Sequence, residues 1–337
     1  MRENIGVVVI GRNEGERLIR CLKSIAAMGQ AMGRVVYVDS GSGDGSVAAA
    51  RGLGVVTIDL DVSVPFTAGR ARNAGMASLL ELSPWIQFVQ FVDGDCELAG
   101  TWFASAVEVF EQQAHTAVVA GRLRERFRQA TIYNKLCDME WDAPPGEAEA
   151  CGGIAMVRVN AFVQAGGFDA GLIAGEEPEL CLRLRRAGWK VWRLAEPMAT
   201  HDAAMERFGQ WWKRTLRGGH AFAEGAWMHG SVRGGHFVRN VYRALLWGIG
   251  VPGMLILSIT VAIIWPPAFA AVAVLALAIF ASGFRAMLWR RSLSDSFSDS
   301  VLYAVFCVIG KFPEALGVLR FHTLRLRNRR GGLVEYK

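Results

Sequence analysis

The chain has 337 residues and a formal net charge of +6, and hydrophobic residues make up 52% of it. Its mean hydropathy of +0.24 is high for a purely soluble protein, and its length exceeds one average domain. We therefore expect one domain of ordinary size joined to a membrane-associated part. Six cysteines without paired spacing argue against a zinc or redox centre and for reduced packing residues: Cys21, Cys96, Cys137, Cys151, Cys181 and Cys307.

The first part of the chain alternates between apolar runs of strand length and segments with helical spacing. This alternation predicts an α/β fold with an open, mainly parallel sheet and helices on both faces. The predicted strands cover residues 5–10, 35–38, 54–58, 86–91, 118–121 and 154–157. The predicted helices cover residues 18–25, 70–82, 101–113, 160–165 and two segments that start after residue 45 and near residue 176. Residues 142–153 are acidic and then glycine-rich, which predicts a mobile loop.

Acidic side chains follow the ends of several predicted strands. Asp93 and Asp95 flank Gly94 directly after the strand at residues 86–91. Hard divalent cations such as Mg²⁺ and Mn²⁺ take oxygen ligands and share them with substrate phosphates, so this tripeptide predicts a metal site; a simple turn is the alternative. Glu14 and Asp39 also follow strand ends, and the carboxyl ends of parallel strands line one ligand crevice.

The C-terminal part has the composition of a membrane domain. Two nearly uncharged stretches predict transmembrane helices at about residues 244–265 and 268–288, joined by a turn with two prolines, although two buried helices of a globular core remain an alternative. Residues 300–320 are apolar but interrupted by charges, which favours an interfacial or re-entrant helix. We place the domain boundary at residues 230 and 231.

Arginines flank the predicted hairpin on one side, which places both of its ends in the cytoplasm. A strand already begins at residue 5, so we expect no signal peptide and a cytoplasmic first domain on a multi-pass protein of the inner membrane. A basic cytoplasmic tail suits an anionic lipid surface, and no aromatic platform for nucleic acid accompanies it. The flanking arginines are Arg233, Arg239, Arg243, Arg285, Arg290 and Arg291, and the tail contains Arg320, Arg325, Arg327, Arg329 and Arg330.

Four ordered motifs together resemble the family 2 glycosyltransferases, which have the GT-A fold. The motifs occupy residues 10–14, 38–46, 68–75 and 93–95, and the resemblance covers about residues 5–219. It implies a Rossmann-like GT-A domain that uses a nucleoside-diphosphate sugar as donor, with a UDP-sugar favoured, and Mg²⁺ or Mn²⁺ as cofactor.

The resemblance also implies roles for single residues. Glu14 and Asp39 would hold the nucleoside, Asp93 would lie close to the ribose or the metal, and Asp95 would bind the ion that bridges the diphosphate. Arg70 and Arg72 match the third motif, and arginine would help the metal to stabilise the leaving diphosphate. Each residue also has a structural alternative: a helix-terminal charge for Glu14, a turn for Asp39 and solvated helix charges for the arginines.

An acceptor hydroxyl needs a carboxylate within hydrogen-bond reach to take its proton. By position in the family, Glu177 would be this base and Glu176 would position the acceptor, although the family usually has Asp at the second position. Acidic residues that stabilise a helix N-terminus are the alternative. His201 would lie near the metal or the diphosphate, or else be a packed histidine.

Trp211 and Trp212 belong to a segment similar to a motif of processive synthases, in a different order. They would stack on the acceptor or lie at the membrane interface. Two or three membrane segments are too few for a polymer channel, so we expect one sugar to be added per encounter.

The leading hypothesis is an inverting, metal-dependent glycosyltransferase with a lipid-linked acceptor, a polyprenyl phosphate or a diphosphate-linked saccharide, in envelope polysaccharide or glycolipid synthesis. A membrane-bound nucleotidyltransferase and a non-catalytic sugar-nucleotide-binding assembly protein are the alternatives. The oligomeric state, the sugar and the linkage are left open. Four basic residues would attract lipid phosphates or serve only as topology signals: Arg239, Arg243, Arg290 and Lys311.

Overall fold

The computed structural model describes residues 4–231 and 235–328, and the chain divides into two compact units, of which the first ends at Glu206 and the second begins at Arg207. The boundary therefore precedes the expected one at residues 230 and 231. The difference is the helix α8 (Phe208–His229), which packs along α13 (Lys311–Leu326) and so belongs to the second unit. Arg233, Arg329 and Arg330, expected to be topology and tail residues, lie outside the described residues.

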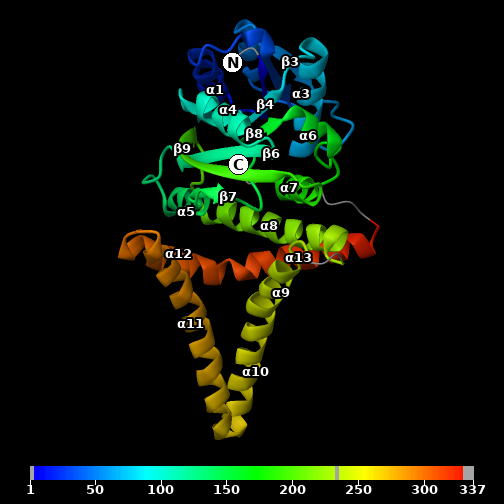
Figure 1. Cartoon of the computed structure of the whole chain (residues 1–337). Coiled ribbons are helices and arrows are strands. Elements are labelled where there is room, and N and C mark those ends of the chain that lie inside the picture. Colours follow the sequence, from blue (N-terminus) through cyan, green and yellow to red (C-terminus); the bar gives the residue numbers. More distant parts are fainter. Residues whose placement is uncertain (1–3, 232–234, 329–337) are drawn as a thin grey trace. The chain divides into compact units, whose positions relative to one another are not determined.

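Within the described part of the first unit, nine strands form one mixed sheet (Figure 1). They are β1 (Ile5–Gly11), β2 (Val35–Asp39), β3 (Val56–Asp59), β4 (Phe88–Asp93), β5 (Cys96–Leu98), β6 (Thr116–Glu125), β7 (Gly146–Glu147), β8 (Ala155–Arg158) and β9 (Lys190–His201). The order is β3-β2-β1-β4-β8-β6-β9-β5, with β7 beside β9. Pairing is parallel from β3 to β4 and between β6 and β9, and antiparallel elsewhere. The predicted α/β fold is confirmed, but the sheet is mixed and not mainly parallel as expected, because β8, β5 and β7 join their neighbours in antiparallel pairs.

Helices connect and cover these strands. They are α1 (Glu16–Ala27), α2 (Ser46–Gly52), α3 (Ala68–Leu82), α4 (Trp102–Gln112), α5 (Ile132–Trp141), α6 (Val159–Gln164) and α7 (Glu176–Arg186), with a short turn η2 (Met32–Arg34). Parallel neighbours need a crossover connection, and α1, α2 and α3 supply the crossovers of the parallel half. The structure adds β5, β7, β9 and α5, which the sequence patterns do not predict.

The inner strands β1, β2 and β4 form the centre of the core. Their apolar side chains are buried on both faces, as expected for parallel strands covered by helices on each side. Helix α3 approaches β1 closely at Gly75, where an added Cβ atom would lie 2.3 Å from Val8 Cγ1. Because residues three apart share a helix face, the close approach at Gly75 also directs Arg72 toward the sheet.

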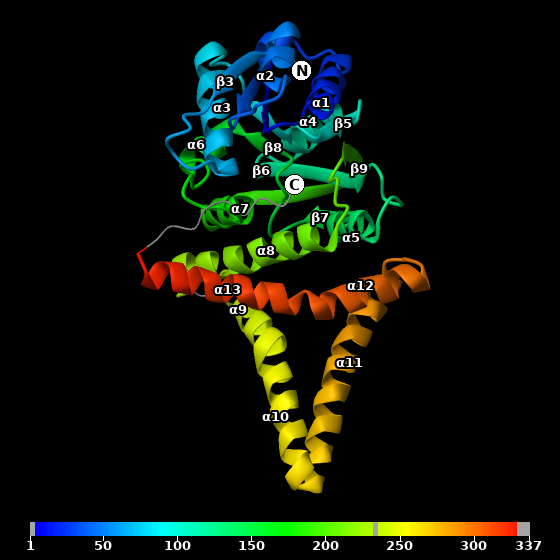
Figure 2. The same ribbon diagram turned by 180° about the vertical axis from the view of Figure 1, so that it is seen from behind.

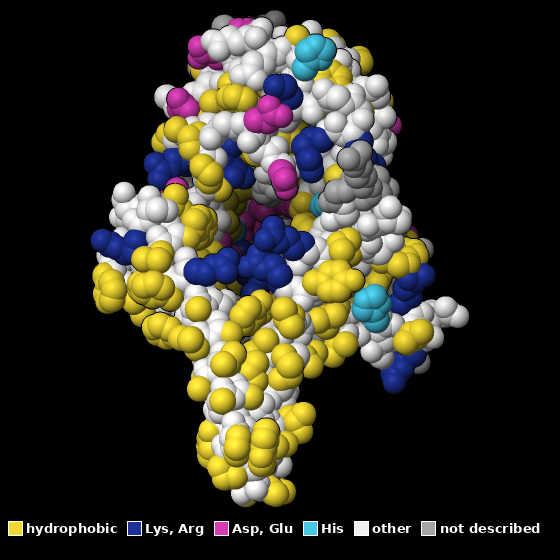
Figure 3. All heavy atoms as spheres, turned by 60° about the horizontal axis from the view of Figure 1, so that its bottom comes forward, with side chains coloured by type: hydrophobic (Ala, Val, Ile, Leu, Met, Phe, Trp, Pro, Cys, Tyr) yellow, Lys and Arg dark blue, Asp and Glu magenta, His cyan; other side chains and the backbone are white. Residues whose placement is uncertain are grey.

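The described part of the second unit consists of helices and the turns that join them (Figure 2). A continuous helix runs through α9 (Val238–Leu245), the π-helical η3 (Leu246–Gly250) and α10 (Val251–Ile264), then turns at η4 (Pro266–Ala268) into α11 (Phe269–Ser292). Among the described residues, three helical segments are long and apolar enough to cross a membrane: Val238–Ile264, Pro266–Ser292 and Phe297–Leu326. The first two contain the stretches expected to be transmembrane. On the face seen in Figure 3, hydrophobic side chains cover the α10–α11 hairpin.

The third segment consists of α12 (Phe297–Ile309) and α13, and differs from the other two. One third of its apolar window is buried (33%), against 17% and 6% for the others, because α13 packs against α8. Lys311 and Glu314 form an ion pair of 2.6 Å within it. Figures 1 and 2 show α12 and α13 running across the α10–α11 hairpin. These features favour the interfacial placement expected for residues 300–320, which stays a prediction.

Glycines allow the helices around α13 to meet backbone to backbone. A Cβ atom added to Gly219 of α8 would lie 2.0 Å from the carbonyl oxygen of Glu314. Likewise, a Cβ atom added to Gly317 of α13 would lie 2.1 Å from the carbonyl oxygen of Leu216. Small residues at such contacts let helices approach closely and pack tightly, as in membrane helix pairs.

We predict that Gly219→Ala lowers the thermal unfolding midpoint of the detergent-solubilised protein by several degrees, because its methyl group forces α8 and α13 apart. Gly218→Ala is the matched control, since an added Cβ atom there meets nothing within 4 Å and alanine favours a helix. Equal midpoints for the two variants would show that the α8–α13 contact does not limit stability.

Candidate active site

Three predicted acidic residues lie at one edge of the sheet. Asp39 ends β2, Asp93 ends β4, and Glu14 follows the end of β1. The strand order β2-β1-β4 makes these ends neighbours: Gly11 is in register with Asp39, and Ile10 is in register with Asp93. The sheet topology thus brings the three together, as the parallel-strand argument expects.

Glu14 lies between the ends of β1 and β4. Cβ atoms added to Gly11 and Gly94 would lie 3.0 and 3.2 Å from Glu14 Cγ, so the side chain lies against both glycines. Its carboxylate forms an ion pair of 2.8 Å with Arg17, one turn further along the chain. This pair is the helix-terminal arrangement weighed as the structural alternative, and nucleoside contact stays a prediction.

Asp39 holds the loop that follows it. Its buried carboxylate accepts hydrogen bonds from the Tyr37 hydroxyl (2.8 Å), the backbone N–H groups of Gly41 (2.9 Å) and Ser42 (2.7 Å), and the Ser42 hydroxyl. Such a turn is the structural role weighed for Asp39. Because most of the acceptor capacity is used locally, any contribution to nucleoside binding would come mainly through the shape of this loop.

The centre of the site is the guanidinium group of Arg72, which is almost fully buried at 3% exposure. Its Nη2 atom lies 2.9 Å from Asp93 Oδ1, and its Nη1 atom lies 2.9 Å from Glu176 Oε1 and 3.3 Å from Glu177 Oε1. One arginine therefore joins the end of β4 to the first turn of α7. The two glutamates predicted as catalytic lie next to the aspartate predicted to bind the donor.

The charges in this cluster shift one another's pKa values. Burial would lower the pKa of Arg72, but the carboxylates of Asp93, Glu177 and Glu176 outweigh it and raise that pKa above its usual value. Burial and the neighbouring Glu176 carboxylate raise the pKa of Glu177 to about 7, and the charge of Arg72 opposes the rise. A carboxylate with such a pKa can exchange a proton near neutral pH, as a general base must.

Arg70 does not join this cluster. Its guanidinium donates hydrogen bonds to the carbonyl oxygens of Val64 (2.8 Å) and Asp61 (2.9 Å), and it lies over the Phe66 ring. Residues two apart project from different sides of a helix, so α3 directs the two arginines apart. Arg70 therefore stabilises the loop before α3. Its predicted contact with the donor stays a prediction.

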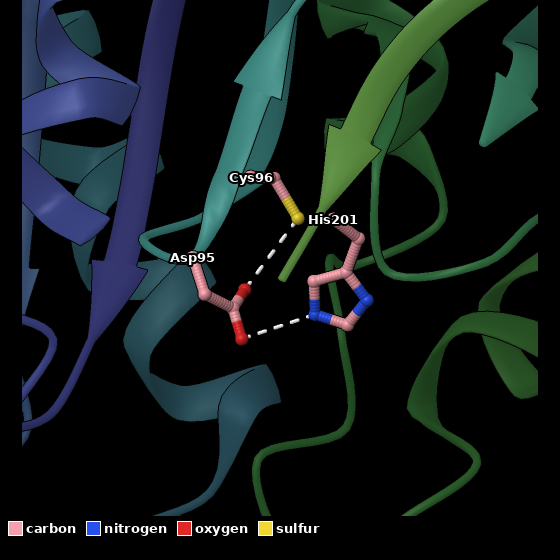
Figure 4. Close-up of side chains that lie close together, drawn as sticks. All are labelled: Asp95, Cys96 and His201. Atoms are coloured by element: carbon pink, nitrogen blue, oxygen red, sulfur yellow. Dashed lines mark hydrogen bonds and ion pairs between the residues drawn. The ribbon is translucent and has the colours of Figure 1, made fainter. Parts of the chain in front are cut away.

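Asp95, Cys96 and His201 form a second group beside the first (Figure 4). His201 Nε2 lies 3.0 Å from Asp95 Oδ2, and the Cys96 thiol donates to Asp95 Oδ1 at 3.5 Å. The carboxylate, sulfur and imidazole atoms all lie within 4.8 Å of one another, the only such group of potential metal ligands among the described residues. A carboxylate with an imidazole nitrogen fits Mn²⁺ better than Mg²⁺, which takes oxygen ligands, whereas the sulfur of Cys96 is a soft donor that favours neither ion.

The structure thus separates the two aspartates of the predicted metal motif. Asp95 is buried beside His201, from the end of β9, whereas Asp93 is 35% exposed and pairs with Arg72. In the register of β5 against β9, Cys96 lies opposite His201. Strand pairing thus brings His201 next to Asp95, although the two residues are 106 positions apart in the chain. Of the three residues predicted to bind the metal, Asp95 and His201 lie together and Asp93 pairs with Arg72, and metal binding by each of them stays a prediction.

A glycine of the segment 142–153 covers the Arg72 cluster. A Cβ atom added to Gly153 would lie 2.5 Å from Arg72 Nη2, 2.9 Å from Glu177 Oε1 and 3.2 Å from Asp93 Oδ2. The chain passes directly over the charged groups, so no side chain larger than hydrogen fits without moving them. The segment expected to be a mobile loop is thereby a wall of the site.

The predicted acceptor-stacking residues Trp211 and Trp212 lie on α8 of the second unit. Trp211 is buried, with its ring edge-to-face against Phe306 at 4.8 Å, and both tryptophans contact Phe208. The burial of Trp211 favours a packing role over contact with an acceptor. Stacking by Trp212, which is half-buried, stays a prediction.

Comparison with known sequences identifies this domain. The sequence profile described as "Glycosyl transferase family 2" matches residues 6–160, which include β1, β4 and the Asp93 to Asp95 motif. The chain contains a family 2 glycosyltransferase domain. The predicted recognition of this family from its four motifs is therefore confirmed.

Curated relatives of this family 2 domain are the pre-mycofactocin glycosyltransferases of two strains of Mycobacterium tuberculosis. Each is 27% identical over 221 residues, which is 59% of this chain and 43% of the relative. The chain thus spans less than half the length of the curated relatives that it matches.

Two solved structures share the fold. The mannosyltransferase PcManGT from Pyrobaculum calidifontis, in complex with GDP-Man and Mn²⁺, has a TM-score of 0.55 and 18% identity over 93% of this chain and 87% of its own. S. aureus TarS 1–349 in complex with UDP-GlcNAc has a TM-score of 0.50 and 11% identity over 97% of this chain and 92% of its own. These likenesses confirm the predicted GT-A fold.

Sequence reasoning missed two components of the site. The sequence predicts only a packing role for Cys96, although its position next to Asp95 is a signal. Gly153 lies in a Cys-Gly-Gly run that predicts a loop, and only the folded chain brings it next to Arg72, 81 positions earlier.

We predict that Glu177→Gln stabilises the protein at pH 8 and changes it little at pH 5. A raised carboxyl pKa means that the native state holds the proton more tightly than the unfolded chain, so stability falls as pH rises toward 7, and glutamine removes this loss. The gain at pH 8 should be on the order of 2 kcal/mol. Thermal unfolding at both pH values measures it, with the exposed Glu147→Gln as control; equal shifts at both pH values would contradict the raised pKa.

We also predict that Gly153→Ala destabilises the protein by about 1–3 kcal/mol, because its methyl group displaces the ion-paired Arg72 guanidinium. Gly152→Ala is the adjacent control, since nothing lies within 4 Å of its added Cβ atom. Denaturant unfolding compares the variants. A neutral Gly153→Ala would show that the segment moves away from Arg72 at little cost.

Proposed function

We propose that this protein is an inverting, metal-dependent glycosyltransferase that moves a sugar from a nucleoside-diphosphate sugar to a lipid-linked acceptor. The single observation that carries the proposal is the buried Arg72, which joins Asp93 to Glu176 and Glu177 at the edge of the sheet. This arrangement places a candidate base beside the strand ends where donors bind in open α/β sheets.

Membership of family 2 supports a nucleotide-sugar donor. The two solved structures with this fold contain GDP-Man and UDP-GlcNAc, so a donor panel must include both guanosine and uridine nucleotides, although a UDP-sugar is favoured by the sequence resemblance.

Asp95 and His201, with Cys96 beside them, would hold the divalent cation, and a carboxylate with an imidazole favours Mn²⁺ over Mg²⁺. When bound, the ion supplies positive charge that stabilises the leaving diphosphate. PcManGT was solved with Mn²⁺, which supports a metal in this fold.

Glu177 would take the proton of the acceptor hydroxyl as that oxygen attacks the anomeric carbon. Its pKa of about 7 suits this step, and its 17% exposure leaves it the more accessible of the two glutamates. Glu176 is 4% exposed and paired with Arg72, so it holds the arginine and the first turn of α7 in place. In-line attack from the side opposite the diphosphate inverts the anomeric centre.

A lipid-linked acceptor, such as a polyprenyl phosphate or a diphosphate-linked saccharide, follows from the apolar helices of the second unit. Arg239 and Arg243 line a cavity of about 720 Å³ together with Tyr242, and would attract the lipid phosphates. Arg290 is instead buried against Asp295 and stacked on Trp289 and Tyr303, so it stabilises the turn between α11 and α12. Lys311 is paired with Glu314.

The positions of the apolar helices and flanking arginines support an inner-membrane location with the first unit in the cytoplasm, acting in envelope polysaccharide or glycolipid synthesis.

The test uses the full-length protein in detergent with a panel of sugar nucleotides, Mn²⁺ and either polyprenyl phosphate or a polyprenyl diphosphate-linked saccharide as acceptor. With the saccharide, whose hydroxyl group needs a base, Glu177→Gln should lower the transfer rate about 100-fold or more while donor binding is kept. Asp95→Asn should weaken Mn²⁺ binding, measured by calorimetry, about tenfold or more. The controls are Glu147→Gln and Asp59→Asn, both exposed carboxylates with a basic partner.

Release of a nucleoside diphosphate supports the transferase. Release of inorganic pyrophosphate in a parallel incubation with a nucleoside triphosphate would instead indicate a nucleotidyltransferase, and donor binding without turnover would indicate a non-catalytic assembly protein. Unchanged transfer by Glu177→Gln would remove this residue from the mechanism.

A further inference from the structure

Two free cysteines meet beside the Arg72 cluster. The sulfur atoms of Cys151 and Cys181 lie 3.6 Å apart, although the residues are 30 positions apart in the chain. Cys181 is buried in α7 one helical turn after Glu177, and Cys151 is half-buried two residues before Gly153. The pair therefore links the segment over the site to the helix that carries the proposed base.

The segment 142–153 is anchored before Cys151. Glu147 of β7 is in register with Trp192 of β9, and the carbonyl oxygens of Glu149 and Ala150 accept from Arg185 and Arg193 at 3.0 and 3.2 Å. Beyond these contacts, residues 151–153 pass from the thiol pair to the Arg72 cluster. A movement of Cys151 would therefore also move Gly153, which is only two residues further along the chain.

We propose that Cys151 and Cys181 are a reversible thiol oxidation site, which a small hydroperoxide converts to a disulfide that ties the segment 142–153 to α7. Disulfides that form in proteins of a reducing compartment are usually transient, with a catalytic or redox-sensing role. A disulfide needs a sulfur separation of about 2.05 Å, so a small movement of the segment closes the gap.

The shared hydrogen bond prepares the pair for oxidation. Donation by the Cys151 thiol lowers the pKa of Cys181, against the effect of burial, and the same bond together with burial raises the pKa of Cys151. Cys181 is thus the better thiolate, and the thiolate is the reactive form of cysteine.

The reaction balances in two steps. The Cys181 thiol gives up its proton and its sulfur attacks one peroxide oxygen. The O–O bond breaks, hydroxide leaves and takes up that proton as water, and Cys181 becomes a sulfenic acid. The Cys151 sulfur then attacks the Cys181 sulfur, the S–O bond breaks, and hydroxide leaves with the thiol proton as water. The two thiols lose two electrons in total, and hydrogen peroxide is reduced to two waters.

The effect on sugar transfer rests on the proposed function. Gly153 has no spare room against Arg72 Nη2 and Glu177 Oε1, so moving Cys151 toward α7 shifts groups of the proposed catalytic site. Misplacement of catalytic groups by about 1 Å lowers rates by up to about 100-fold, and we expect the disulfide to lower transfer about tenfold or more.

The experiment treats the full-length protein in detergent with hydrogen peroxide and then maps peptides by mass spectrometry. We expect a Cys151–Cys181 cross-linked peptide that dithiothreitol removes, slower amide hydrogen exchange in residues 142–153, and lower transfer restored by dithiothreitol. Cys151→Ser should abolish all three effects, as should Cys181→Ser. Cys307→Ser, which removes a half-buried cysteine of the second unit, should behave as the unsubstituted protein.

Absence of the cross-linked peptide overturns the proposal, as does a cross-link that leaves the exchange of residues 142–153 unchanged. If the reduced protein transfers no sugar, the proposed function fails, while peptide mapping and hydrogen exchange still decide the thiol site. A cross-link that slows exchange without lowering transfer in an active protein overturns the regulatory effect.

Discussion

The site depends on one buried positive charge. A guanidinium removed from water is strongly unfavourable without ionised partners, and three carboxylates placed together without a cation would repel one another. Arg72 and its partners Asp93, Glu176 and Glu177 resolve both problems at once. Because these residues come from α3, β4 and α7, the ion pairs also hold three segments of the fold in one arrangement.

This arrangement gives Asp93, which ends β4, and Asp95, which follows it, different surroundings. Asp93 faces the arginine, whereas Asp95 faces His201 from β9, so the charge cluster and the candidate metal group share one short turn. The proposed base and the proposed metal site are thereby coupled through the backbone around Gly94. The second unit is organised differently. Its helices are long and apolar, and they approach one another closely at glycines.

Much of the first unit could be predicted from the chain because its signals are local. The apolar runs of β1, β2 and β4, the helical spacing of α1 and α3, and the acidic start of α7 are each contained in a dozen residues or so. The weaker signals were missed: β9 contains Glu196 and Pro197 within a twelve-residue strand, and α5 mixes charged, polar and aromatic residues, so neither shows a clear apolar period.

The amino-acid sequence by itself determined the α/β class, the family, the acidic strand ends and the apolar character of the C-terminal helices, because short-range periodicity and residue type carry that information. Only the tertiary structure decided that Arg72 and not Arg70 meets the glutamates, that His201 pairs with Asp95, and that Cys151 meets Cys181. The reason is physical: partners 30 to 106 residues apart become neighbours through strand register and helix packing, which no local pattern encodes.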